Sequence, residues 1–170
     1  MHINTNIVEA QGDLLDKVEK LVAKVFPFRD FSEKMSFFAY KKQHYPLIKW
    51  FMRMAGVSAF VNTWAAIDDK GEVNGTTGLY LTTEDEKSAV WLSWFCVDPD
   101  KRGLGIGRML IEFSINQAKA LGKEYLRLYT SDDPSEVAAQ VLYEKYGLSV
   151  FKEEKHGDTT YLYRELKLSG

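Results

Sequence analysis

The segment Val97-Asp98-Pro99-Asp100-Lys101-Arg102-Gly103-Leu104-Gly105-Ile106-Gly107-Arg108 joins two patterns of opposite character. The nearly uninterrupted apolar run 89–97 predicts a strand covered on both faces, and the apolar positions after the segment recur at helical spacing. Three glycines at alternate positions predict a tight turn in which backbone amides can approach a ligand closely. Because the first amides of a helix lack partners and carry partial positive charge, the turn predicts a phosphate site that Arg102 and Arg108 can neutralise.

Two widespread phosphate-binding motifs do not match this turn. A dinucleotide fingerprint requires G-x-G-x-x-G early in the chain, and here the third glycine falls at the wrong spacing and past the middle. A nucleotide P-loop requires Gly-Lys-Ser/Thr, which the sequence lacks. A strand-to-helix turn without a ligand is the alternative, but three alternating glycines carry an entropic cost that a simple turn does not require.

The spacing that does match is Arg-x-x-Gly-x-Gly, at Arg102, Gly105 and Gly107. A second segment further along reads Glu136-x-x-Ala139-x-x-Leu142-Tyr143-Glu144-Lys145-Tyr146-Gly147-Leu148. In both segments the chain resembles the GCN5-related N-acetyltransferase (GNAT) superfamily, whose patterns are [Q/R]-x-x-G-x-[G/A] and N-x-x-A-x-x-L-Y-x-x-x-G-F. The resemblance covers residues 90–151 well. It implies an α/β, single-domain fold with a central mixed, mostly antiparallel sheet flanked by helices, in which splayed strands hold acetyl-CoA.

The resemblance also implies roles for individual residues. Backbone groups near Phe95 and Val97 would bind the pantetheine arm, and the amides of 102–108, with Gly103, Gly105 and Gly107 among them, would hold the pyrophosphate. Tyr143 would protonate the leaving thiolate, to which a tyrosine with a pKa of about 10 is well matched. Tyr143 as an ordinary core aromatic is the alternative. Glu136 stands where the family commonly has Asn and Leu148 where it has Phe, which puts one polar contact near the CoA arm in doubt.

Periodicity and turn residues predict the order of elements along the chain. We expect helices at 12–25, 32–44, 46–56, 108–121 and 136–146, and strands at 59–67, 73–83, 89–97, 125–130, 148–153 and 159–166. The 170 residues contain no linker or repeat and predict one domain. We expect 1–57 to be a helical, acceptor-side region and 58–170 to hold the sheet and the CoA-binding core.

Composition excludes several classes of protein. Apolar residues make up 45%, too many for a disordered chain, and the net charge of −2 without a basic cluster argues against a nucleic-acid partner. The lone Cys96 cannot form an internal disulfide or a four-cysteine zinc site, and we expect no metal. Neither a signal peptide nor an apolar membrane span is recognisable. We therefore expect a cytoplasmic protein without a membrane partner, and a homodimer is left open.

The acceptor is less defined than the donor. Ten aromatic residues lie between Phe26 and Phe60, and we interpret them as mostly core, with part of the acceptor side of the cleft among them. We predict acetyl transfer to a primary amine by direct attack in a ternary complex, with a small-molecule amine first and a protein or peptide amine next. A non-catalytic CoA-binding module is the rival. We name no general base, because the residues of suitable type lie in loops: Glu84, Asp85, Glu86, Asp132, Asp133, His44 and His156.

Overall fold

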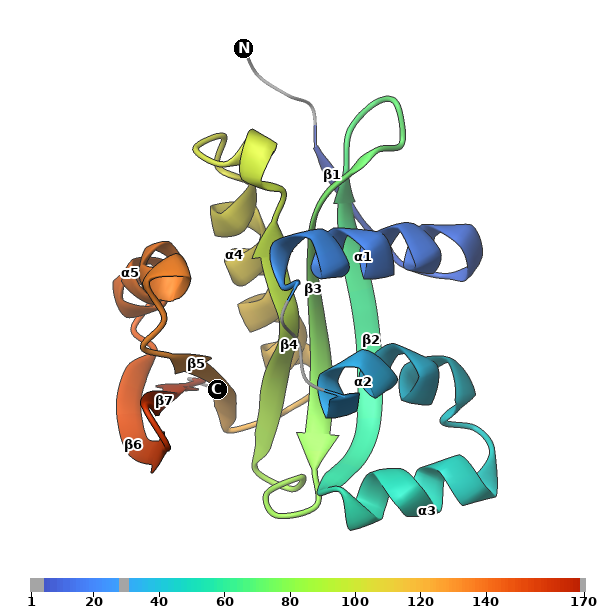
Figure 1. Cartoon of the computed structure of the whole chain (residues 1–170), viewed down its shortest axis with the longest axis vertical. Coiled ribbons are helices and arrows are strands. Elements are labelled where there is room, and N and C mark those ends of the chain that lie inside the picture. The colour runs from blue at the N-terminus through green and yellow to red at the C-terminus, as the bar shows by residue number, and fades with distance from the viewer. Residues whose placement is uncertain (1–4, 28–30, 169–170) are drawn as a thin grey trace.

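A seven-stranded sheet with helices on both faces forms the framework of the protein (Figure 1). The structure, a computed structural model, describes residues 5–27 and 31–168, without the side chains of residues 31–34 and 135. Its elements are β1 (Asn6–Glu9), α1 (Gly12–Val25), α2 (Phe31–Lys42), α3 (Pro46–Met54), β2 (Val57–Ile67), β3 (Val73–Thr82), β4 (Ala89–Val97), η1 (Pro99–Lys101), α4 (Ile106–Ala120), β5 (Tyr125–Ser131), η2 (Pro134–Glu136), α5 (Val137–Lys145), β6 (Ser149–His156) and β7 (Thr159–Lys167).

The strand order is β1-β2-β3-β4-β5-β7-β6. All neighbouring strands are antiparallel except β4 and β5. These two strands are parallel because α4 lies between them in the sequence and returns the chain to the edge of the sheet at which β4 begins. The mixed, mostly antiparallel sheet predicted from the sequence is therefore confirmed.

Helix α4 covers the back of the sheet in the view of Figure 1. Its residues Leu110, Ile111, Ser114 and Ala118 recur at helical spacing and are all fully buried. Ile111 and Ala118 belong to a core with Leu79, Val90, Leu126 and Tyr143, which come from β3, β4, β5 and α5. On the back of the sheet, α4 and α5 thus pack against both β4 and β5.

Helices α1 and α2 cross the front of the sheet (Figure 1). Val18 and Val22, one turn apart on α1, are completely buried, and they pack with Phe37 of α2 and Cys96 of β4. Helix α3 contributes less to this core, because only Met52 of its side chains is buried. The predicted helices and strands are all present, with ends shifted by a few residues. Within the described part of the chain, no helix has the length and apolar character needed to cross a membrane.

One strand is missing from the sequence-based order. Strand β1 pairs with the edge of β2, where Ile7 lies opposite Ala66 and Val8 opposite Ala65. It has only four residues, with two apolar ones between Asn6 and Glu9, which is too short a pattern for periodicity to detect. The region 1–57 therefore contributes a strand to the sheet as well as three helices.

Candidate active site

Strands β4 and β5 run side by side for only part of their length. They pair at Ala89–Trp91 with Tyr125–Arg127, and the register ends there. Strand β4 remains paired with β3 as far as Val97. Beyond Trp91 the two parallel strands therefore separate, which confirms the splayed strands expected from the resemblance. We refer to this opening as the gap.

A bulge in β4 lies beside the gap. Gly78 is opposite Ser93 and Thr76 is opposite Cys96, so β4 has one residue more than β3 between these pairs. Trp94 lies within the bulge and has a φ of 48°, which is unusual for a bulky residue. Its ring stacks on Phe37 with the centroids 5.3 Å apart. This bulge could not be predicted from the sequence, because nothing in the apolar run favours a positive φ at a tryptophan.

The bulge fixes which backbone groups face the gap. The Asp98 amide donates to the Asn74 carbonyl of the β3 side, 2.9 Å away. Since successive peptide groups along a strand point to opposite edges, Cys96 also faces β3, and the N–H and C=O of Phe95 and Val97 face the gap. These are the two positions to which the resemblance assigned the pantetheine arm.

The glycine turn lies at the end of β4. Gly103 and Gly105 have φ values of 77° and 83°, which only glycine adopts readily. A Cβ at either position would meet no atom within 4 Å, so the turn has open space around it. Gly105 is the N-cap of α4, and the amides of 106–108 precede the first helical hydrogen bond, from Met109 N–H to Gly105 O at 3.1 Å. The arrangement fits a pyrophosphate.

The two arginines of the turn are exposed. Arg108 forms an ion pair with Glu112, one turn further along α4, with Nε and Oε1 2.9 Å apart. The same Oε1 accepts a hydrogen bond from the Tyr146 hydroxyl at 2.6 Å. The hydrogen bond to Glu112 raises the pKa of Arg108, so its positive charge is permanent and lies within one helical turn of the open amides.

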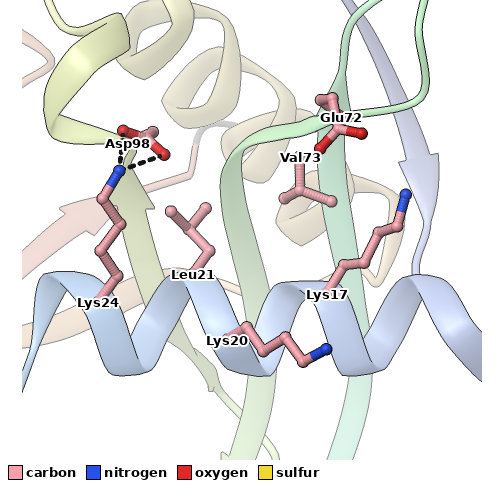
Figure 2. A pocket seen from close by; sticks show the side chains of 7 residues that line it. All are labelled: Lys17, Lys20, Leu21, Lys24, Glu72, Val73 and Asp98. Atoms are coloured by element: carbon pink, nitrogen blue, oxygen red, sulfur yellow. Dashed lines mark hydrogen bonds and ion pairs between the residues drawn. The ribbon is translucent and has the colours of Figure 1, made fainter.

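An ion pair from α1 holds the start of the turn in place. Lys24 Nζ lies 2.9 Å from Asp98 Oδ1 and 3.0 Å from Asp100 Oδ2, and Asp98 also accepts from the Asp100 amide at 3.0 Å. Burial opposes ionisation of Asp98, but its hydrogen bonds with Lys24 and the Asp100 amide lower its pKa overall. Figure 2 shows Lys24 reaching Asp98 across a cavity of about 250 Å³ that is also lined by Lys17 and Lys20.

Tyr143 approaches the gap from the back of the sheet. The side chain is 4% exposed, and its ring lies 5.5 Å from that of Phe95. Burial raises the pKa of Tyr143, so the hydroxyl keeps its proton throughout the physiological pH range. Within the described part of the chain no hydrogen bond of this hydroxyl is found. Tyr143 thus has a protonated hydroxyl, and its ring packs behind Phe95 of β4.

Glu136, which replaces the family's usual Asn, has partners of its own. Its carboxylate accepts from the Ser131 hydroxyl at 2.6 Å and from the Ser131 amide at 3.2 Å. Gln140 Nε2 donates to the Ser131 carbonyl at 2.8 Å. Glu136 therefore links the start of α5 to the end of β5 through its hydrogen bonds with Ser131. Leu148 is fully buried in the core, a packing position as expected.

The aromatic residues from Phe26 to Phe60 divide between core and surface. Phe37 is 1% exposed and Tyr40 donates to Asn62 Oδ1 at 3.0 Å, whereas Trp50 and Phe51 are each 56% exposed. Phe28, Arg29 and Asp30 lie outside the described residues, as does the side chain of Phe31. A second cavity, of about 460 Å³, lies between the start of α1 and the end of α2 and is lined in part by Tyr40 and His44.

The candidate bases are scattered, and several of them have partners, such as Asp132, whose Oδ1 accepts from the Thr160 amide at 3.1 Å. Asp85 lies 2.8 Å from Arg127 Nη1 and accepts from Trp91 Nε1 at 3.0 Å. Glu86 accepts a hydrogen bond from Ser58. Among the described residues no group of three or more His, Cys, Asp or Glu side chains could hold a metal ion.

Comparison with known proteins agrees with this geometry. A family model for the acetyltransferase (GNAT) domain matches residues 60–148, just over half of the chain. The chain belongs to the GNAT acetyltransferase family. The match begins in β2 and ends after α5, so it contains the gap, the glycine turn and Tyr143.

Solved structures of GNAT proteins share the whole fold. An acetyltransferase of the GNAT family from Staphylococcus aureus Mu50 is 21% identical, with a TM-score of 0.70 over 96% of this chain and 99% of that one. The ribosomal-protein-S18-alanine N-acetyltransferase from Escherichia coli is 17% identical, with a TM-score of 0.69 over 98% and 95%. A GNAT family acetyltransferase from Brucella melitensis, in complex with acetyl-CoA, is 18% identical, with a TM-score of 0.64 over 99% and 91%. A search of curated protein sequences found no significant match.

Membership of the GNAT family establishes the class of reaction. The protein is an acetyltransferase, and GNAT enzymes use acetyl-CoA as the acetyl donor. The acceptor is not determined by membership, and neither are the roles of individual residues.

Proposed function

We propose that this GNAT enzyme transfers the acetyl group of acetyl-CoA to a primary amine of a small molecule, by direct attack in a ternary complex. The observation that carries this proposal is the meeting of three features at one place: the gap between β4 and β5, the glycine turn at the end of β4, and Tyr143 behind Phe95.

The donor side can be assigned residue by residue. The amides of 102–108 hold the pyrophosphate, since they lie in a turn opened by Gly103 and Gly105 and at the N-terminus of α4. Gly107 belongs to the first turn of that helix, and a Cβ at this position would lie 3.5 Å from Leu142 Cδ2, an ordinary van der Waals contact. Arg102 and Arg108 supply positive charge at the rim. The free edge of β4 at Phe95 and Val97 binds the pantetheine arm as a further strand would.

Tyr143 acts as the general acid. Acetyl-CoA supplies the acetyl group as a thioester, which reacts with amines without prior activation. As the nitrogen–carbon bond forms and the carbon–sulfur bond breaks, Tyr143 donates its proton to the departing sulfur, and it is reprotonated from solvent while the nitrogen loses one proton. Its raised pKa suits this role, because the hydroxyl is never lost to ionisation near neutral pH.

A covalent route through Cys96 is less well supported. Its side chain is 4% exposed and packs in the cluster formed by α1, Phe37 and Ala65. A cysteine nucleophile needs access to the substrate and an environment that favours the thiolate, and burial among apolar groups gives neither. A buried free thiol suits a reducing compartment, and we place the reaction in the cytoplasm.

The chain itself favours a small acceptor over a protein. On the front of the sheet beside the gap, Tyr80, Trp91, Tyr163 and Tyr129 form a row of neighbouring rings. Such a surface suits a small apolar acceptor better than an extended peptide, which is usually bound through its backbone. We assign 1–57 to the acceptor side, together with the strands it covers, and 58–170 to the donor side. A homodimer is compatible with either acceptor.

A thiol-release assay with a broad amine panel tests the function. Purified protein, acetyl-CoA and each amine are mixed, and free CoA is measured with a thiol reagent. A set of peptides with a free N-terminal amine and a lysine represents the competing acceptor class. We expect turnover with at least one small amine and slower turnover with peptides. If acetyl-CoA binds in calorimetry but no amine or peptide releases CoA above the hydrolysis background, the protein is a CoA-binding module and the proposed function is wrong.

A further inference from the structure

A row of aromatic rings crosses the front of the sheet beside the gap. Tyr80 and Trp91 are direct partners on β3 and β4, with centroids 6.3 Å apart. Trp91 lies 6.3 Å from Tyr163 of β7, nearly perpendicular to it. Tyr129 of β5 lies 6.0 Å from Tyr163 and 6.2 Å from Tyr161. We call these five residues the aromatic wall.

The aromatic wall is on the same face as α1 and α2. Phe60, which lies opposite Tyr80 in the register, contacts the Tyr80 ring at 6.3 Å and the Tyr40 ring of α2 at 5.8 Å. The opposite face carries the core under α4 and Tyr143. The wall and the proposed general acid thus reach the sheet from opposite faces, which leaves the front face free for an acceptor.

Tyr129 places the wall at the opening itself. It lies two residues beyond Arg127, the last residue of β5 that pairs with β4, and on the same face as Arg127. Its side chain is 45% exposed, whereas Trp91 beside it is 9% exposed. Trp91 is therefore a buried part of the aromatic wall, and Tyr129 is an exposed part next to the point where β4 and β5 separate.

The charged groups around the wall are already paired with one another. Arg127 lies 2.8 Å from Asp85 and 2.9 Å from Glu165. Lys152 lies 2.6 Å from Glu154, and its Nζ is 5.0 Å from the centre of the Tyr163 ring. A carboxylate or phosphate on the acceptor would have to break one of these pairs, whereas an apolar ring can stack without doing so.

Two of the rings are also held by hydrogen bonds before any acceptor arrives. Trp91 Nε1 donates to Asp85, 3.0 Å away, and the Tyr163 hydroxyl donates to Glu154 Oε2 at 2.8 Å. Side chains that are already ordered lose little conformational entropy when a ligand packs on them. The aromatic wall is therefore a partly preordered surface on which a flat ligand can pack.

From these contacts we infer that the acceptor is a flat, apolar primary amine of the arylalkylamine class, whose ring packs against Tyr129 in front of the gap. The inference rests on the proposed acetyl transfer and narrows its acceptor. The same rings could attract a cationic aliphatic chain by cation–π contact, so a polyamine is the competitor that the test includes.

The test compares amines and variants in one assay. The probes are 2-phenylethylamine, n-butylamine and spermidine, and kcat/KM is measured at saturating acetyl-CoA for the wild type and for Tyr129→Leu, Tyr129→Phe and Tyr125→Leu. Tyr125→Leu is the matched control, since Tyr125 lies on the same strand and face but in the part where β4 and β5 still pair.

We expect 2-phenylethylamine to be the best of the three acceptors. Because an aromatic pair contributes about 0.5–1.5 kcal/mol beyond area burial, Tyr129→Leu should lower kcat/KM for this amine by about 2- to 12-fold. The Tyr129→Phe and Tyr125→Leu variants should stay near the wild type, and the KM for acetyl-CoA should not change. A preference for spermidine or n-butylamine, or an equal loss for all three amines in Tyr129→Leu, would overturn the inference while leaving acetyl transfer intact.

A binding measurement separates this inference from the proposed function. 2-Phenylethylamine is titrated calorimetrically into protein saturated with CoA, which requires no turnover. Binding that Tyr129→Leu weakens and Tyr125→Leu does not would support the wall even if no amine were acetylated. Absence of binding to the wild type would overturn it.

Discussion

The replacement of Tyr143 by phenylalanine tests the proposed chemistry most directly. Phenylalanine keeps the ring that packs 5.5 Å from Phe95 and removes only the hydroxyl. Since that hydroxyl is buried and no hydrogen bond of it is found in the described part of the chain, the change leaves no stranded partner. We expect the free energy of unfolding to change by less than about 1 kcal/mol, because only one unpaired hydroxyl is lost.

The expected effect on catalysis is much larger. General acid catalysis contributes about 10²- to 10⁴-fold, and a thiolate is already a fair leaving group, so we expect kcat to fall by about 100-fold. A 100-fold loss corresponds to about 2.7 kcal/mol of lost transition-state stabilisation. The KM for acetyl-CoA should stay within about twofold, because the hydroxyl would act only as the carbon–sulfur bond breaks.

The assay is steady-state thiol release combined with thermal unfolding of the same preparations. Tyr125→Phe serves as the control, since it removes a tyrosine hydroxyl on β5 in the part of the strand that still pairs with β4. Because burial raises the pKa of Tyr143, the wild-type kcat should show no alkaline loss at the ordinary tyrosine value of about 10. A fall in kcat of less than about threefold in Tyr143→Phe, with normal stability, would refute the role of Tyr143 as the acid.

Three further changes test the turn, the sheet and the β6–β7 hairpin. Gly105→Ala places a Cβ at a φ of 83° without a steric neighbour, so it should cost about 1–2 kcal/mol of stability through backbone strain and weaken acetyl-CoA binding in calorimetry; unchanged affinity would contradict the phosphate assignment. Gly75→Ala brings a Cβ to 2.9 Å from Leu110 Cδ1 and should lower stability by about 1–3 kcal/mol in denaturant titration. Gly107→Ala is the control for stability, because its Cβ meets nothing closer than 3.5 Å. Equal losses of stability in the two variants would show that the contact of Gly75 with α4 is not tight. The hydrogen bond from Lys152, followed by that from Tyr163, lowers the pKa of Glu154 from 4.5 to about 2. The ionised Glu154 therefore contributes its full stabilisation of the fold above pH 4.5, and this stabilisation is lost as the pH falls to 2. Glu154→Gln should make the melting temperature less dependent on pH between these values, and an unchanged pH dependence would contradict the role of Glu154.

Local patterns of residues determined most of the elements and the glycine turn between β4 and α4. The apolar run of β4, the alternating glycines and the helical spacing of α4 are all contiguous in the chain, and their outcome depends on short-range backbone preferences and burial. The position of Tyr143 followed from a second segment of the same kind. These features were predictable because each is encoded within a few turns or one strand.

Three features depended on contacts between distant segments. The four residues of β1 become a strand only because β2 offers an unpaired edge. The positive φ of Trp94 is stabilised by the stack on Phe37, which lies in a different helix. Lys24 fixes the start of the glycine turn from α1, across 74 residues of sequence.

The aromatic content shows the same division. The sequence showed that 14% of the residues are aromatic and placed ten of them between Phe26 and Phe60. It could not show that the row beside the gap would be assembled from β3, β4, β5 and β7, with only Phe60 and Tyr40 extending it toward α2. The sequence by itself determined the glycine turn, the family and the class of reaction, because those depend on short contiguous motifs. The tertiary structure decided which rings lie together in front of the gap, because a side chain's face and neighbours are set by strand register, and register depends on pairing between segments far apart in the chain.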